Sequence, residues 1–132
     1  MARRTRIVYW KPAAGHDPWE ESGPSGRVIG NTWAEELRQG LTLPQLEPIA
    51  SREFVNAIRR KFELMKPGEM QDFPEAVEDE GMIELNFPDA GLQLRWTDQY
   101  VEVDARVLWT DTGHAIDELA ADFELEWFDF RN

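Results

Sequence analysis

From residue 82 to residue 109 the sequence alternates between apolar and polar side chains, and this period of two most constrains the fold. Alternation of this kind is typical of strands that bury one face. The segments between the runs, 88–91 and 97–99, are rich in turn residues. The pattern therefore predicts a three-stranded antiparallel meander. Its apolar positions are Ile83, Leu85, Phe87, then Leu92, Leu94, Trp96, then Val101, Val103, Ala105, Val107 and Trp109.

One helix is predicted before this meander in the sequence and another after it. Residues 51–66 carry apolar side chains at a spacing of about 3.6, with Ser51 suited to the N-cap and Pro67-Gly68 as the stop. A second helix is predicted from Asp111 or Thr112 to Phe123. The apolar stripes are Phe54, Val55, Ile58, Phe62 and Met65 in the first helix, and Ile116, Leu119, Ala120 and Phe123 in the second.

The remaining segments complete the expected element order. Residues 5–10 and 124–130 read as strands, and a short helix is expected from Asn31 or Thr32 to Arg38. Residues 11–31 are rich in Gly and Pro and are interpreted as irregular, and 69–80 as an acidic connector. We therefore expect a single domain over 1–132, in which 11–50 is a largely irregular insertion with one short helix.

This order favours an α+β fold. We expect a two-layer sandwich with a mainly antiparallel sheet and helices on one face, ferredoxin-like with an extra strand. A length of 132 residues is typical of one domain.

Charge is unevenly distributed along the chain. Residues 1–66 contain 11 basic and 8 acidic side chains, a balance of +3, whereas residues 67–132 contain 3 and 18, a balance of −15. Such a second half repels nucleic-acid phosphates and anionic membrane surfaces, and it attracts a basic protein surface. Solubility alone is the other interpretation of the excess acid. We therefore expect a basic protein partner, no nucleic acid and no membrane, with the oligomeric state left open.

The absence of Cys excludes disulfides, thiolate metal sites and cysteine nucleophiles. The basic start of the chain has too short an apolar run for a signal peptide, and no stretch has the length of a membrane helix. A cytoplasmic location is the resulting expectation.

The two histidines, His16 and His114, are the only candidates for imidazole chemistry. His16 lies beside Asp17, and His114 lies near Asp111 and Asp117, but neither has the spacing of a known metal site or a recognisable nucleophile. We therefore expect no metal, no cofactor and no catalytic residue.

Acidic side chains and one tryptophan are the candidate partner-binding residues: Glu78, Asp79, Glu80, Glu102, Asp104 and Trp19. Glu102 and Asp104 project from one strand face, where Arg95 and Arg106 are expected to pair with them on a solvated surface. Trp19 and Trp33 lie in or near loops, where an exposed indole can anchor an interface.

The second half of the chain resembles small uncharacterised bacterial proteins that include immunity proteins of polymorphic toxin systems. The residues that carry the resemblance are Leu92-x-Leu94-x-Trp96, Gln99-Tyr100-Val101-Glu102-Val103-Asp104, Ile116-Asp117 and Trp127-Phe128-Asp129. The resemblance implies a compact acidic module that sequesters a partner without catalysis.

The sequence thus predicts a non-enzymatic acidic binding module, of the immunity or inhibitor type, for a basic partner protein. Two alternatives stay open: a small enzyme with a His and carboxylate site at His114 or His16, and a structural or oligomeric subunit.

Overall fold

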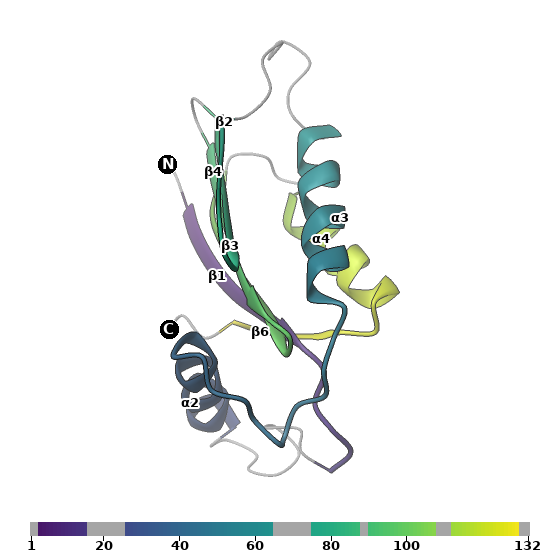
Figure 1. Cartoon of the computed structure of the whole chain (residues 1–132). Helices are drawn as coiled ribbons and strands as arrows, with labels where there is room; N and C mark the ends of the chain where they lie inside the picture. The colour runs from purple at the N-terminus through teal and green to yellow at the C-terminus, as the bar shows by residue number, and fades with distance from the viewer. Residues whose placement is uncertain (1–2, 16–25, 65–74, 88–89, 108–111, 130–132) are drawn as a thin grey trace.

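The computed structural model describes residues 3–15, 26–64, 75–87, 90–107 and 112–129. These residues form three helices and six strands (Figure 1). In chain order they are β1 (Arg3–Trp10), α2 (Gly26–Arg38), α3 (Ser51–Leu64), β2 (Glu75–Asp79), β3 (Met82–Phe87), β4 (Ala90–Thr97), β5 (Tyr100–Val107), α4 (Thr112–Asp122) and β6 (Glu126–Asp129). No helix among the described residues is long and apolar enough to span a membrane.

The strands form one antiparallel sheet in the order β2-β3-β4-β5-β1-β6. β1 pairs with β5 and β6, and β5 also pairs with β4, so β1 and β4 run parallel with β5 between them. This is the split arrangement of a ferredoxin-like sheet, which β3 and β2 extend at one edge. The expected α+β sandwich with a mainly antiparallel sheet is confirmed.

One face of the sheet packs against α3 and α4 (Figure 1). The alternation predicted from the sequence places Ile83, Leu94 and Val103 on this face, where all three are buried. Tyr9 contributes from β1, and its ring meets that of Phe54 edge-on at a centroid distance of 5.3 Å. This layer is the main hydrophobic core.

The opposite face carries α2 at one end of the sheet (Figure 1). Trp10 lies between Trp33 of α2 and Phe128 of β6, with ring centroids 5.8 Å and 5.6 Å away. Gly30 makes this approach possible, because a Cβ atom there would lie 2.4 Å from the Phe128 ring. The expectation of helices on one face therefore holds for α3 and α4, while α2 builds a second, smaller core on the other side.

Trp33 also corrects the sequence interpretation, which placed it among possible interface anchors. Its side chain is buried against Trp10 because α2 packs on the sheet, and the helix begins at Gly26, earlier than the expected Asn31 or Thr32. The Gly and Pro content of residues 11–31 suggested a loop, since both residues have low helix propensity. Packing against the sheet outweighs that preference.

The acidic connector expected at 69–80 is also corrected, because it contains β2. This strand pairs with β3, and the chain turns at Gly81, whose φ of 73° suits glycine. The sequence of β2 shows no clear alternation, with Ala76 and Val77 as its only apolar residues. A short, charged edge strand of this kind is one that sequence periodicity detects poorly.

Candidate functional site

Two adjoining pockets lie where the end of α2 meets the turn between β4 and β5. The first has a volume of about 290 Å³ and the second about 330 Å³, and both are lined by Gly40 and Thr97. The first extends to the β2–β3 turn, and the second extends to Leu41 and Pro48. We call the combined hollow the α2 groove.

The end of α2 forms one wall of the groove through a helix-terminating turn. Gly40 has a φ of 86°, and its N–H donates to the Leu37 carbonyl at 3.0 Å. The Leu41 N–H reaches back to the Glu36 carbonyl at 3.1 Å, which completes a Schellman motif. This turn leaves Leu41 51% exposed at the groove.

Gln99 fixes the other wall by tying the β4–β5 turn to the loop after α2. Its Oε1 accepts from the Leu43 N–H at 2.7 Å, and its Nε2 donates to the carbonyls of Leu43 and Leu46 at 2.7 and 2.9 Å. Ser51 adds a second tie, because its hydroxyl donates to the Thr97 carbonyl. These bonds hold both pocket walls in a fixed relation.

Ser51 therefore acts differently from the N-cap that the sequence suggested. The Phe54 N–H, a group that such a cap would satisfy, donates to the Ala50 carbonyl at 3.1 Å. The Ser51 hydroxyl is buried against the β4–β5 turn instead.

The rim of the groove carries acidic side chains from two separate turns. Asp79 and Glu80 are exposed at the β2–β3 turn, and Asp98 is exposed at the β4–β5 turn. Asp79 Oδ1 accepts from the Glu80 N–H at 2.8 Å, which orders this carboxylate at the rim. Cationic side chains with long apolar stems, Lys and Arg, suit a groove with this rim and an exposed leucine.

Two arginines line the first pocket as well, and one of them is already neutralised. Arg38 Nε lies 3.3 Å from Glu102 Oε1, and its Nη1 lies 3.7 Å from Glu35 Oε1. Arg95 lies directly opposite Glu102 in the sheet register. The charge of Arg38 is therefore matched by Glu102 and Glu35.

Glu102 itself is buried rather than solvated. Only 5% of its side chain is exposed, because α2 covers this part of the sheet and supplies Arg38 as its partner. The sequence predicted that Glu102 lies on a solvated face and pairs with Arg95 and Arg106. In the structure it is buried and pairs with Arg38. Arg95 is a neighbour in the register, and the Arg106 side chain lies outside the description.

Burial and the nearby Glu102 carboxylate both affect the pKa of Tyr100. Burial raises the pKa of its hydroxyl to about 12, and the Glu102 carboxylate adds to the rise while Arg95 and Arg38 oppose it. The phenol therefore stays neutral at physiological pH and lines the groove as a polar, uncharged group.

The structure places two of the six predicted partner-binding residues, Asp79 and Glu80, in the groove, and two more on the same face of the sheet. Asp79 and Glu80 line the groove, Glu102 lies behind Arg38, and Asp104 lies on the same face, one row further along β5. Glu78 turns to the other face. Trp19 lies outside the described residues, as do His16 and Asp17.

Glu78 belongs to the contact between β2 and α3. Its Oε1 lies 3.0 Å from Arg59 Nη1 and 3.5 Å from Arg52 Nη2. Arg52 also lies over the Trp96 ring, 5.3 Å from its centroid. The contiguous sequence Glu78-Asp79-Glu80 is therefore divided between the two faces by strand alternation.

Neither histidine can be placed in a site. His114 lies in α4, but its side chain is outside the description. Among the described residues, no group of three His, Cys, Asp or Glu side chains is arranged to hold a metal ion.

Sequence reasoning missed Arg38, Leu41 and Gln99 as parts of this site. The partners of Gln99 are 53 and 56 residues away along the chain, so a polar residue in a turn gave no signal of its buried role. Gly40 did carry a signal, because a glycine just past a helix is typical of a helix end.

No protein-family model matches this chain, and a search of curated proteins found no match.

Proposed function

We propose that this protein is a non-enzymatic binding module whose α2 groove holds a basic segment of another protein. The observation that carries the proposal is the convergence of Asp79, Glu80 and Asp98 on the rim of one groove. These acids come from turns that are separated in the sequence. A chain with a formal charge of −12 adds a long-range field that attracts a basic surface.

The chemistry of the groove lining suits lysine and arginine side chains. The Leu41 side chain and Pro48 offer apolar contact to the stem, and the rim carboxylates offer hydrogen-bond acceptors to the charged head. Because the rim acids are exposed, they accelerate association and make it sensitive to salt. Because Gln99 already holds the walls in place, binding loses less conformational entropy.

The proposal includes sequestration of the partner without catalysis, which is the role that the resemblance to immunity proteins implies. It also keeps the cytoplasmic location expected from the sequence. A toxin or nuclease with a basic surface is the class of partner that this role requires.

The test begins with the partner that the tagged chain retains from a lysate of its source cell at low salt and releases at high salt. The purified partner is then titrated calorimetrically against the wild-type chain and the double variant Asp79→Lys/Glu80→Lys. We expect at least about a tenfold loss of affinity, equivalent to about 1.4 kcal/mol.

The matched control is Glu53→Lys/Glu118→Lys, which makes the same change of net charge at exposed positions of α3 and α4. We expect its affinity to stay within about twofold of the wild type in moderate salt, where distant charges are screened. An equal loss in both double variants would show that net charge alone binds the partner and would refute the groove.

A further inference from the structure

A second exposed feature lies away from the α2 groove, where α4 ends and β6 begins. Trp127 of β6 is 57% exposed, and among the described residues only Leu41 is another large apolar side chain exposed to this degree. Tryptophan is the residue most enriched among those that dominate binding energy at interfaces. Trp127 lines neither pocket of the α2 groove, so the proposed function does not account for its exposure.

The end of α4 has an electrostatic arrangement unlike those of α2 and α3. The C-terminal end of a helix carries a partial negative charge, which basic residues in the last turn usually offset. Arg38 provides this in α2 and Lys61 in α3, but α4 has no basic residue in its last turn. Instead, exposed Asp122 and Glu124 add negative charge there.

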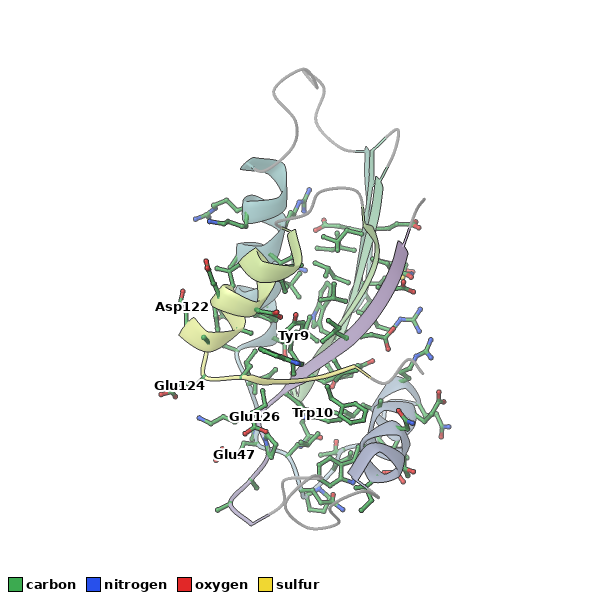
Figure 2. All side chains as sticks on the ribbon, turned by 180° about the vertical axis from the view of Figure 1, so that it is seen from behind. Tyr9, Trp10, Glu47, Asp122, Glu124 and Glu126 are labelled. Atoms are coloured by element: carbon green, nitrogen blue, oxygen red, sulfur yellow. The ribbon has the colours of Figure 1, made fainter. Side chains whose placement is uncertain are left out.

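Lys11 lies near two carboxylates close to the end of α4. Lys11 Nζ lies 3.5 Å from Glu124 Oε2 and 4.0 Å from Glu47 Oε2. Glu126 follows at the start of β6, in register with Trp10. Figure 2 shows Glu47, Glu124 and Glu126 on the same side of the molecule, near the end of α4.

We propose that these residues form a second interaction surface, which takes an extended basic segment of a partner protein. The surface, here called the Trp127 corner, consists of Glu47, Asp122, Glu124 and Trp127. An arginine or lysine of the segment lies over the Trp127 indole and places its charge at the end of α4. Indole faces attract cations, and the helix end and its acids add to that attraction.

An extended segment fits because β6 is an edge strand. It pairs with β1 on one side, and within the described residues no strand lies on its other side. A segment laid along this edge can bond to backbone groups of β6 while its side chains reach Trp127.

A second copy of this chain is a poor occupant of the corner. A two-fold dimer would place the same acidic residues of both copies against each other. Each copy also has a formal charge of −12, which opposes self-association. Charge complementarity therefore selects a basic partner.

The first experiment titrates the full-length, isotope-labelled chain with a synthetic seven-residue peptide of alternating Arg and Val, blocked at both ends. NMR spectra follow the backbone amides and the indole N–H groups. We expect saturable shifts at the Trp127 indole and at residues 124–127, and an affinity at least tenfold weaker at about 0.15 M than at about 0.01 M ionic strength. A peptide with Glu in place of Arg serves as the control and should cause no such shifts.

The variants Trp127→Ala and Asp122→Lys separate binding from structure. Trp127→Ala should weaken peptide binding at least tenfold with an unchanged urea midpoint. Asp122→Lys should have opposite effects on two measurements: weaker binding, because it neutralises the corner, and a higher urea midpoint, because it offsets the helix end. Glu118→Lys, an equal charge change one turn earlier in α4, is the matched control and should leave binding within about twofold.

Binding by Trp127→Ala or Asp122→Lys that equals the wild type would overturn the proposal. Shifts confined to the α2 groove, and lost in Asp79→Lys/Glu80→Lys, would also overturn it while leaving the proposed function intact. Shifts at the corner that persist in that groove variant would support it, whatever the outcome for the groove.

Discussion

At the scale of single residues, Gln99 is a buried polar side chain with a structural role. It is 7% exposed and bonds to three backbone groups of the loop that follows α2. Because the amide supplies one acceptor and two donors, Gln satisfies the loop in a way that Glu or Leu cannot.

The substitution Gln99→Leu should therefore destabilise the fold. It leaves the Leu43 N–H and two carbonyls without their bonds, at a cost of about 2–4 kcal/mol. Urea unfolding followed by circular dichroism measures this loss. Gln93→Leu on β4 is the control, because Gln93 is half-buried and donates to the Met82 sulfur at 3.1 Å, so it should cost under about 1 kcal/mol. Equal losses would contradict the role assigned to Gln99.

Glu124 is the second residue with a role set by backbone geometry. Its φ of 58° lies in the left-handed region, where it ends α4 in a Schellman motif completed by the Leu125 N–H and the Ala120 carbonyl at 2.9 Å. A side chain there costs about 1–2 kcal/mol relative to glycine.

We expect Glu124→Gly to stabilise the protein by up to about 1 kcal/mol, after the greater flexibility of glycine in the unfolded chain is subtracted. The ion pair with Lys11 is lost, but at 81% exposure of the Glu124 side chain it contributes little. Thermal unfolding checks the gain. Glu124→Ala removes the same ion pair but keeps the strained backbone, so a gain of the same size in that variant would contradict the explanation.

At the scale of elements, the position of α2 depends on the contact between Gly30 and Phe128. The helix can approach the sheet closely because Gly30 has no side chain at the point where the Phe128 ring packs. Trp10 then fills the space between Phe128 and Trp33, so that this small core depends on one glycine.

Gly30→Ala should destabilise the protein by about 1–2 kcal/mol. Overpacking costs about 1–3 kcal/mol, and the higher helix propensity of alanine returns at most about 1 kcal/mol of that loss. The measurement is a double-mutant cycle with Phe128→Leu, followed by urea unfolding. The two substitutions should be less than additive, since a smaller side chain at 128 makes room for the methyl group. Strict additivity would show that the two residues do not press on each other.

At the scale of the whole molecule, the two tyrosines lie on opposite faces of the sheet, and their pKa values depend on the packing of each face. Tyr9 faces α4, where its hydroxyl donates to Asp117 Oδ1 at 2.9 Å, and Tyr100 faces the α2 side. Burial, then the charge and hydrogen bond of Asp117, raise the pKa of Tyr9 above its ordinary value of 10.0. The pKa of Tyr100 is raised to about 12.

The chain should therefore show no tyrosinate absorbance at pH 10 while it is folded. Both hydroxyls have a higher pKa in the folded chain than in the unfolded chain. The stabilisation is complete below pH 10 and is lost as the pH rises toward 12. Alkaline titration by ultraviolet absorbance, with and without urea, measures this difference. Since the chain has only these two tyrosines, Tyr9→Phe and Tyr100→Phe assign the signal. Normal titration of either tyrosine in the folded state would contradict its burial.

Charge acts at this scale too, and it separates the two proposed surfaces. The groove rim belongs to the β2–β3 and β4–β5 turns, and the Trp127 corner belongs to α4 and β6. The sequence excess of acid in residues 67–132 is thus divided among several places in the fold. Some of it is used internally, as Glu78 shows in its contacts with Arg52 and Arg59.

The sequence by itself determined the elements whose periodicity is strong. The alternation of β3, β4 and β5 and the apolar stripe of α3 follow from local patterns, since one buried face requires them. These elements also determined the α+β class, because few arrangements bury such faces.

Tertiary structure decided what local patterns could not encode. It placed α2 on the opposite face through Gly30, paired a charged β2 at the sheet edge, and gave Gln99 partners more than fifty residues away. It also buried Trp33 and left Trp127 exposed, although both are tryptophans in regular elements. Burial of a given side chain depends on which segment packs over it, and that is a property of the assembled chain.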